Sequence, residues 1–143
     1  MGFMEKSIFL KVLDGDVPGQ VLYQDDDIFA ILTIMPHHPG HSLVIPRKQV
    51  DKLYDLDEKS YRKVLDFAKV LSLVLEEIYQ PKRVGLSVEG LAVPHAHVHV
   101  IPINHIGDMD HDKARPASAE QLSEVATLIR AALQERGYQR WSL

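Results

Sequence analysis

The sequence predicts a single α+β domain in which a mostly antiparallel sheet packs against two helices. Short apolar runs bounded by turn residues alternate with two long segments whose apolar residues repeat with helical spacing. The 143 residues contain no internal repeat, low-complexity tract or linker, so we assign residues 1–143 to one domain. The expected strands precede the first helix and lie between the two helices, which is the order typical of an α+β protein.

The expected strands are short. They lie at Val21–Tyr23, Ile28–Ile34, Ser42–Ile45, Val84–Val88 and Ala96–Ile101. The three consecutive aspartates at 25–27 fit a solvated turn between the first two strands better than a metal site. Prolines at 36 and 39 and the glycine at 40 indicate a loop before the third strand.

Two amphipathic helices complete the predicted fold. Asp55 is expected to open the first, with Glu58 as its capping-box partner, and Pro81 to end it. This helix is apolar over a wider face than one side of a small sheet can cover, which favours a homodimer contact or, as the alternative, deep burial within one subunit. The second helix begins at Ser118 and stops at Gly137.

Composition narrows the class of protein. The absence of cysteine excludes disulfides, thiolate catalysis and cysteine-ligated metal. A net charge of -4 with scattered Lys and Arg disfavours nucleic-acid binding. No run approaches the roughly 20 apolar residues of a membrane span, and the first residues do not resemble a signal peptide. We therefore expect a cytoplasmic protein without nucleic-acid or membrane partners.

Six of the eight histidines fall in two short motifs, PHHPGH at 36–41 and HAHVH at 95–99. Because side chains alternate along a strand, His95, His97 and His99 are expected on one face, with neighbours roughly 7 Å apart and the outer pair about 13 Å apart. Three interpretations compete: a solvent-facing strand, a metal site that combines His41 with His97 and His99, and nucleophilic catalysis on phosphorus. Strict alternation disfavours the first, and the length of the row prevents its three members alone from holding one ion.

The HAHVHVI segment matches the pattern His-φ-His-φ-His-φ-φ, where φ is an apolar residue, and so resembles the histidine-triad (HIT) superfamily. Residues 7–50, with their PGHSLVIP motif, resemble the amino-terminal half of that family, and the resemblance extends over roughly residues 3–103. It implies a HIT-like fold: a five-stranded antiparallel sheet with a long central helix and a carboxy-terminal helix, in a homodimer. It also implies a purine nucleotide substrate attacked at its α-phosphorus, with no cofactor.

By position in the family pattern, His97 is the nucleophile that becomes nucleotidylated. His99 orients the phosphate or relays protons, His95 stabilises the array through hydrogen bonds, and His41 supports the triad. The resemblance further assigns a nucleotide pocket to residues around the triad, although most of its apolar members would otherwise be interpreted as core. They are Ile8, Phe9, Val12, Leu32, Thr33, Ile34 and Leu91.

Several positions depart from the family pattern. The positions that hold a structural zinc in many bacterial relatives correspond to Ser7, Leu10, Gln49 and His95, so we predict no structural zinc. Thr33 replaces an aspartate that holds the ribose, which weakens the expected ribose contact.

Before the triad, Leu91 and Ala92 replace residues that donate hydrogen bonds to the phosphate or the leaving group. Slow turnover is one expected consequence. Alternatively, the missing donors are supplied by the loop with His105 and His111, two histidines otherwise interpreted as surface residues, or by the tail near Trp141 of the partner subunit. Two further classes therefore stay open. One is a nucleotide-binding module with weak catalysis, and the other is a metal-dependent hydrolase built on His41, His97 and His99.

Overall fold

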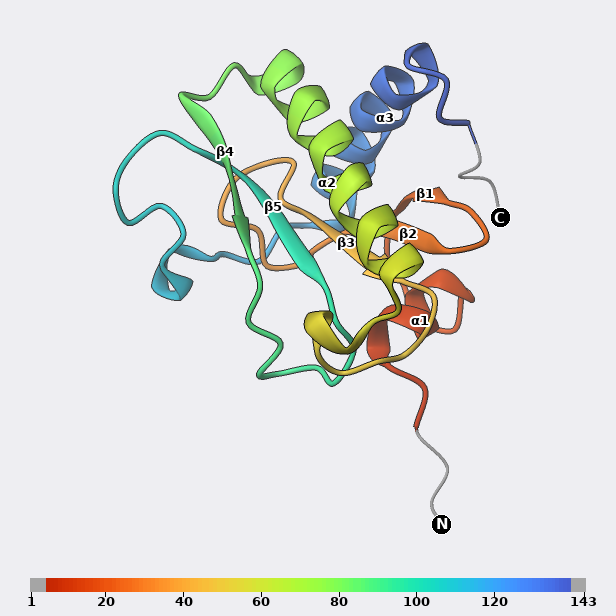
Figure 1. The fold of residues 1–143 in the computed structure, drawn as a ribbon. Coiled ribbons are helices and arrows are strands. Elements are labelled where there is room, and N and C mark those ends of the chain that lie inside the picture. Colours follow the sequence, from red (N-terminus) through yellow and green to blue (C-terminus); the bar gives the residue numbers. More distant parts are fainter. Residues whose placement is uncertain (1–4, 140–143) are drawn as a thin grey trace.

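A computed structural model describes residues 5–139 of the chain, so Trp141 lies outside the described residues. Five strands form one sheet, two long helices cover one of its faces, and a short helix lies on the other (Figure 1). No helix among residues 5–139 is long and apolar enough to cross a membrane. The elements are α1 (Ile8–Leu13), β1 (Val21–Gln24), β2 (Ile28–Leu32), β3 (Ser42–Pro46), η1 (Leu53–Asp55), α2 (Glu58–Tyr79), β4 (Arg83–Ser87), β5 (Val98–Ile103), η2 (His111–Lys113) and α3 (Ala119–Glu135).

The sheet has the strand order β1-β2-β3-β5-β4, and every neighbouring pair is antiparallel. This confirms the predicted five-stranded antiparallel sheet with a long central helix and a carboxy-terminal helix. The pairing of β3 with β5 sets Leu43 opposite His99. It therefore brings the segment that follows the PHHPGH motif beside the strand that carries the third histidine of HAHVH.

Alternation along the strands separates two apolar cores. Ile28, Ala30 and Leu32 of β2 point into the core beneath α2 and α3. Phe29 and Ile31 point the opposite way, into the core beneath α1. Since successive side chains of a strand face opposite sides, both faces of β2 are covered and all five of its residues are buried.

The amino terminus of α2 differs from the prediction. Asp57, not Asp55, caps the helix, and its carboxylate accepts a hydrogen bond from the backbone N–H of Ser60. Glu58 is the first helical residue, so it cannot act as the third-position partner of a capping box. Asp55 lies instead in the short 3-10 helix η1. At the other end the left-handed Gln80 closes the helix immediately before Pro81, as predicted.

The wide apolar face of α2 is partly covered within the same chain. Phe67 and Val74 are buried in the core that α3 completes with Ile129 and Leu133. Leu73 on the outer side of α2 stays exposed. Intrachain packing therefore accounts for much of the second apolar flank, and the homodimer stays a prediction.

Both predicted ends of α3 are confirmed. Ser118 and Gln121 form a reciprocal capping box at its start, which satisfies two backbone N–H groups of the first turn. At its end Gly137 has φ +91°, a conformation that favours glycine. The N–H of Tyr138 then returns to the carbonyl of Leu133.

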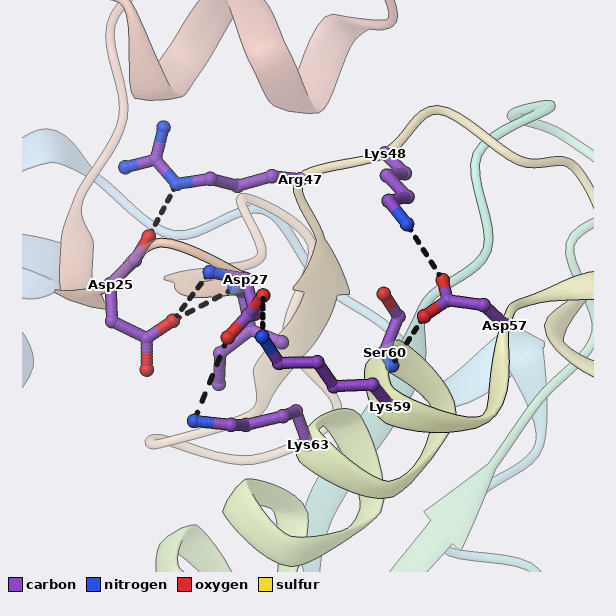
Figure 2. A network of polar contacts seen from close by, with 9 residues as sticks. Asp25, Asp27, Arg47, Lys48, Asp57, Lys59, Ser60 and Lys63 are labelled. Carbon is purple, nitrogen blue, oxygen red and sulfur yellow. Dashed lines mark hydrogen bonds and ion pairs between the residues drawn. The ribbon is translucent and has the colours of Figure 1, made fainter.

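The aspartates at 25–27 form the turn between β1 and β2, as predicted. One carboxylate oxygen of Asp25 accepts the N–H groups of Asp27 and Ile28, at 2.8 and 3.0 Å. Figure 2 shows how Asp27 in turn faces Lys59 and Lys63 of α2, at 3.7 and 3.6 Å. These contacts join the turn to the first turns of α2.

Candidate active site

The three histidines of HAHVH begin before the strand rather than inside it. The predicted strand began at Ala96, but β5 begins at Val98. Of the three histidines, only His99 therefore belongs to the strand. The reason lies in the backbone hydrogen bonds: the N–H of Ala96 is donated to the carbonyl of Val50, in the loop after β3. Residues 95–97 therefore sit against that loop, and the pairing of β4 with β5 reaches only Ser87 and His99.

Alternation nevertheless keeps the rings on one side. Val98 and Val100 point into the core beneath α2. The rings of His97 and His99 lie 5.0 Å apart between centroids, and Phe9 of α1 contacts His97 edge-on at 4.7 Å. The histidine row therefore lies on the face of the sheet that α1 covers.

The site is not a row of solvent-facing polar groups. His95 is 0% exposed, His41 is 2% exposed and His97 is 6% exposed, while His99 is half-buried. A buried ring nitrogen must find a hydrogen-bond partner, because an unsatisfied one loses its contacts with water without compensation. These partners determine which nitrogen of each ring carries the proton.

His95 is held at both ring nitrogens. Its Nε2 lies 2.6 Å from the carbonyl of Pro46, which only accepts, so Nε2 carries the proton. Its Nδ1 must then accept, and the hydroxyl of Ser7 donates to it at 2.6 Å. The Ser7 oxygen also accepts the N–H of Leu10, as the cap of α1. His95 therefore ties the short helix to the sheet, which agrees with a stabilising role.

The ring of His97 presents a lone pair at Nε2. Its Nδ1 lies 2.7 Å from the backbone carbonyl of His95, so Nδ1 carries the proton and donates it. Burial lowers the pKa of His97, which keeps the ring neutral near pH 7. A neutral imidazole with its Nδ1–H engaged and its Nε2 unprotonated is the form that can attack phosphorus.

A second chain of hydrogen bonds sets the proton on His99. The backbone N–H of His37 donates to Nδ1 of His41 at 3.1 Å, so that nitrogen is an acceptor. His41 must carry its proton on Nε2, which donates to Nδ1 of His99 at 2.9 Å. His99 therefore carries its own proton on Nε2. The array thus offers one nucleophilic nitrogen, on His97, and one N–H donor, on His99.

The rings of His41 and His99 are both neutral near pH 7. Burial, reinforced by repulsion from His99 and His37, lowers the pKa of His41 to about 3. Burial, reinforced mainly by repulsion from His97, lowers the pKa of His99 to about 4. Glu89 opposes the shift of His99, since a negative charge favours the imidazolium.

The residues that the resemblance assigns to a nucleotide pocket do not all lie together. Phe9 contacts His95 and His97, and Val12 packs in the same core beneath α1. Leu32 faces the opposite core, beneath α2. Ile8 and Ile34 are exposed, and Leu91 is 93% exposed. The oxygen of Thr33 accepts the N–H of Met35 at 3.2 Å.

A cavity of about 420 Å³ lies on the far side of His41. It is formed by the loop that precedes β3, the segment after η2 and the first turns of α3. His37 and His41 belong to its wall, whereas His97 and His99 do not. Sequence reasoning assigned no role to His37, although its position four residues before His41 in PHHPGH was a usable signal.

The loop with the remaining histidines folds back toward the row. His111 of η2 pairs with Glu89 at 2.7 Å, and its ring lies 6.2 Å from that of His37. His105 stays exposed beside Asp108. The prediction of an ordinary surface position thus describes His105, while His111 is a surface residue placed close to the site.

The residues considered as metal ligands contact one another or other groups. Among residues 5–139 no three His, Cys, Asp or Glu side chains are grouped to hold a metal ion. The positions of the family's structural zinc also do not fit one: Ser7 and His95 hydrogen-bond to each other, and the N–H of Ser7 is donated to the side-chain oxygen of Gln49 at 3.0 Å. Both nitrogens of His95 are engaged, and a hydroxyl and an amide are poor zinc ligands beside one imidazole.

Known proteins resemble this chain in sequence and fold. The model of the HIT domain matches residues 14–106. An uncharacterized HIT-like protein of Methanocaldococcus jannaschii is 30% identical over 133 residues, which cover 86% of this chain and 98% of that protein. A bis(5'-adenosyl)-triphosphatase of Saccharomyces cerevisiae is 30% identical over 108 residues, 68% of this chain and 52% of the yeast protein.

A solved structure of a related protein has the same fold. The crystal structure of a Hit-like protein involved in cell-cycle regulation from Bartonella henselae superimposes with a TM-score of 0.78 at 30% identity. The match covers 92% of this chain and all of that one. With the sequence match over residues 14–106 and this shared fold, the chain belongs to the HIT-domain family.

Proposed function

We propose that this protein cleaves purine nucleotide conjugates at their α-phosphorus, with Nε2 of His97 as the nucleophile. The observation that carries the proposal is the protonation pattern of the row: Nδ1–H of His97 is donated to the carbonyl of His95, which leaves a lone pair on Nε2. No prior deprotonation is needed, because the buried ring is neutral near pH 7. The yeast relative's name, a bis(5'-adenosyl)-triphosphatase, supports a nucleotide substrate.

The reaction would proceed in two steps. Nε2 of His97 forms a bond to the α-phosphorus, and the bond to the leaving group breaks with its electron pair on that group. The Nε2–H of His99, which follows from the contact of its Nδ1 with His41, would protonate the leaving group. Water then attacks phosphorus and passes its proton to Nε2 of His99, and the nucleotidyl–His97 bond breaks with its electron pair on Nε2 of His97, which restores the free imidazole.

The substrate would lie on the α1 face of the sheet. Phe9 packs against the His97 ring, so the base of the nucleotide would rest beside α1 and its exposed Ile8. Leu32 packs in the core beneath α2 and lines the cavity beside His41, so it would support the site from that side rather than hold the base. As the resemblance implies, we propose a homodimer as the active form, in which the exposed Leu91 would contact substrate or partner.

The test measures covalent chemistry at His97. A fluorogenic adenosine phosphoramidate is incubated with wild type, His97→Ala and the control His105→Ala, each with and without chelator. The masses of the quenched proteins are then measured by mass spectrometry. We expect turnover and a trapped adenylyl adduct in wild type and His105→Ala, and neither in His97→Ala. Full activity of His97→Ala refutes the nucleophile, and loss of activity with chelator favours the metal-dependent alternative.

A second candidate is a nucleotide-binding module with weak catalysis. It is favoured by Leu91 and Ala92, which project no donor toward a leaving group, and by Thr33, whose oxygen already accepts the N–H of Met35. Titration of adenosine monophosphate by calorimetry separates the two candidates. Binding of adenosine monophosphate together with no adduct from the phosphoramidate on His97 supports the module, and an adduct from the phosphoramidate supports the enzyme.

A further inference from the structure

The imidazole rings of this protein form a row that is longer than the triad. Between centroids, His97 and His99 are 5.0 Å apart, His99 and His41 are 5.1 Å apart, and His41 and His37 are 5.0 Å apart. The row crosses from β5 to the loop before β3. It begins at the buried His97 and ends at His37, which is half-buried and lines the 420 Å³ cavity.

Three of these rings are joined by direct nitrogen–nitrogen contacts. Nε2 of His41 lies 2.9 Å from Nδ1 of His99, and Nδ1 of His37 lies 3.2 Å from Nδ1 of His41. Because the backbone N–H of His37 makes Nδ1 of His41 an acceptor, the His37 ring can approach it only with its own Nδ1–H. Both of these nitrogen–nitrogen links therefore have a donor facing an acceptor, oriented from His37 toward His99.

The outer nitrogen of His37 is the end of the row. Its Nε2 is buried and has no hydrogen-bond partner among residues 5–139. With the proton on Nδ1, this Nε2 is an acceptor, and His37 also lines a cavity that is large enough to admit several water molecules, so a small rotation of the buried ring would bring Nε2 to water. A proton taken up there can enter the row without crossing the substrate side of the sheet.

We propose that His37 is a positioning residue that completes a proton relay, His37–His41–His99, between the cavity and the leaving group. The inference rests on the proposed function, since the relay serves the departure of a leaving group from phosphorus. It adds a residue outside the triad and a second, solvent-side route for protons. The groups that face the relay from neighbouring elements are His97, Glu89 and His111.

The chemistry of His99 creates the need for such a relay. With a pKa of about 4, His99 is a neutral ring near pH 7, and loss of its only N–H proton would leave an imidazolate. Imidazolate is far too basic to form in this way, so donation from Nε2 has to be matched by arrival of a proton at Nδ1. The only ring nitrogen that faces Nδ1 of His99 among the described contacts is Nε2 of His41.

The protons balance over the two chemical steps. When the leaving group departs, it takes the Nε2 proton of His99; His41 passes its Nε2 proton to His99, His37 passes its Nδ1 proton to His41, and a proton from solvent binds Nε2 of His37. When water attacks nucleotidyl–His97, its proton goes to Nε2 of His99 and the row shifts back. A proton then leaves Nε2 of His37 for solvent, and all three rings return to their starting tautomers.

The backbone of His37 sets the resting direction of the relay. Its N–H donates to Nδ1 of His41 only while that nitrogen is unprotonated. The shifted state loses this hydrogen bond, which favours return to the starting tautomers after each turnover. One residue thus supplies both the mobile ring proton and the fixed amide that resets the row.

The first test compares two leaving groups in His37→Phe, which keeps an aromatic ring and the backbone N–H. His38→Phe is the matched control, because the His38 ring contacts Pro39 and Tyr79 and stands outside the row. An adenosine phosphoramidate of an alkylamine needs a proton for departure, whereas the p-nitrophenyl ester of adenosine monophosphate does not. We expect His37→Phe to lower kcat roughly 10²-fold on the amine substrate and less than about 2-fold on the ester.

His38→Phe is expected to change neither rate. An equal loss on both substrates in His37→Phe would show that His37 only maintains the structure, and undiminished kcat on the amine would show that no relay through His37 is used. Either result overturns the proposal. Because the comparison is a ratio within one variant, a partly unfolded fraction affects both substrates alike.

The second test uses wild type and needs no turnover. In protein labelled with ¹⁵N at histidine, nitrogen–nitrogen coupling across the hydrogen bonds is expected between Nδ1 of His37 and Nδ1 of His41, and between Nε2 of His41 and Nδ1 of His99. Missing coupling between His37 and His41 overturns the relay even in an active enzyme. Intact coupling without an adduct on His97 instead overturns the proposed function, and with it the use of the row in catalysis.

Discussion

Acid is expected to destabilise this protein through His41. The buried ring has a pKa of about 3, because burial and the nearby His99 and His37 disfavour its charged form. In the unfolded chain the same ring titrates near 6.5. Between these values the unfolded chain binds a proton that the folded protein does not, so the stabilisation present above about pH 6.5 is lost as the pH falls toward 3.

The magnitude follows from the two pKa values. Between the two pKa values, each pH unit below about 6.5 lowers the free energy of unfolding by about 1.4 kcal/mol. At about pH 4.5, two units lower, His41 alone therefore lowers it by about 3 kcal/mol. Urea unfolding at about pH 7.5 and 4.5 measures this loss in wild type and in His41→Gln, whose amide does not titrate.

The difference between the two proteins isolates His41, because His95, His97 and His99 titrate in both. Wild type is expected to lose about 3 kcal/mol more than His41→Gln between the two pH values. Equal losses would refute the reasoning, since they would mean that His41 accepts a proton in the folded protein as readily as in the unfolded chain.

Two further substitutions test the supports of the site. Ser7→Ala removes the hydroxyl that donates to His95, and urea unfolding is expected to show a loss of about 1–3 kcal/mol from the unsatisfied ring nitrogen; an unchanged stability would mean that another donor replaces it. Gly40→Ala is expected to lower the Tm well below that of Gly15→Ala. Both glycines have positive φ, but a Cβ at Gly40 would lie 2.7 Å from the Tyr79 side chain whereas one at Gly15 meets open space. Equal shifts would show that only the backbone conformation matters.

Local patterns in the sequence were sufficient for most of the fold. The apolar repeat that ends at Pro81, the capping residues at Ser118 and the aspartate turn at 25–27 all lie where predicted, because each depends on interactions between residues close in sequence. The start of α2 was misplaced by two residues for the same reason. Asp55 and Asp57 are both acceptable caps locally, but Asp55 is the last residue of η1 and Asp57 caps α2.

The site divides in a similar way. The HAHVH and PHHPGH motifs identified four of its histidines, and the HIT-domain match supports that assignment of the family. The motifs did not show which other residues line the site. Leu32 and Thr33 are neighbours in sequence, yet Leu32 points into the α2 core, because side chains alternate about a strand whose end the sequence alone did not locate.

By itself the sequence determined the elements, the family and the presence of a histidine row, since these depend on periodicity, turn residues and motif spacing. The tertiary structure alone decided the chemical state of that row. The carbonyl of Pro46 and the hydroxyl of Ser7 set the proton of His95, and the contact with His41, itself oriented by the amide of His37, sets the proton of His99. Hydrogen bonds between segments far apart in the chain have no periodicity of their own, so only the packed fold shows which nitrogen can attack and which can donate.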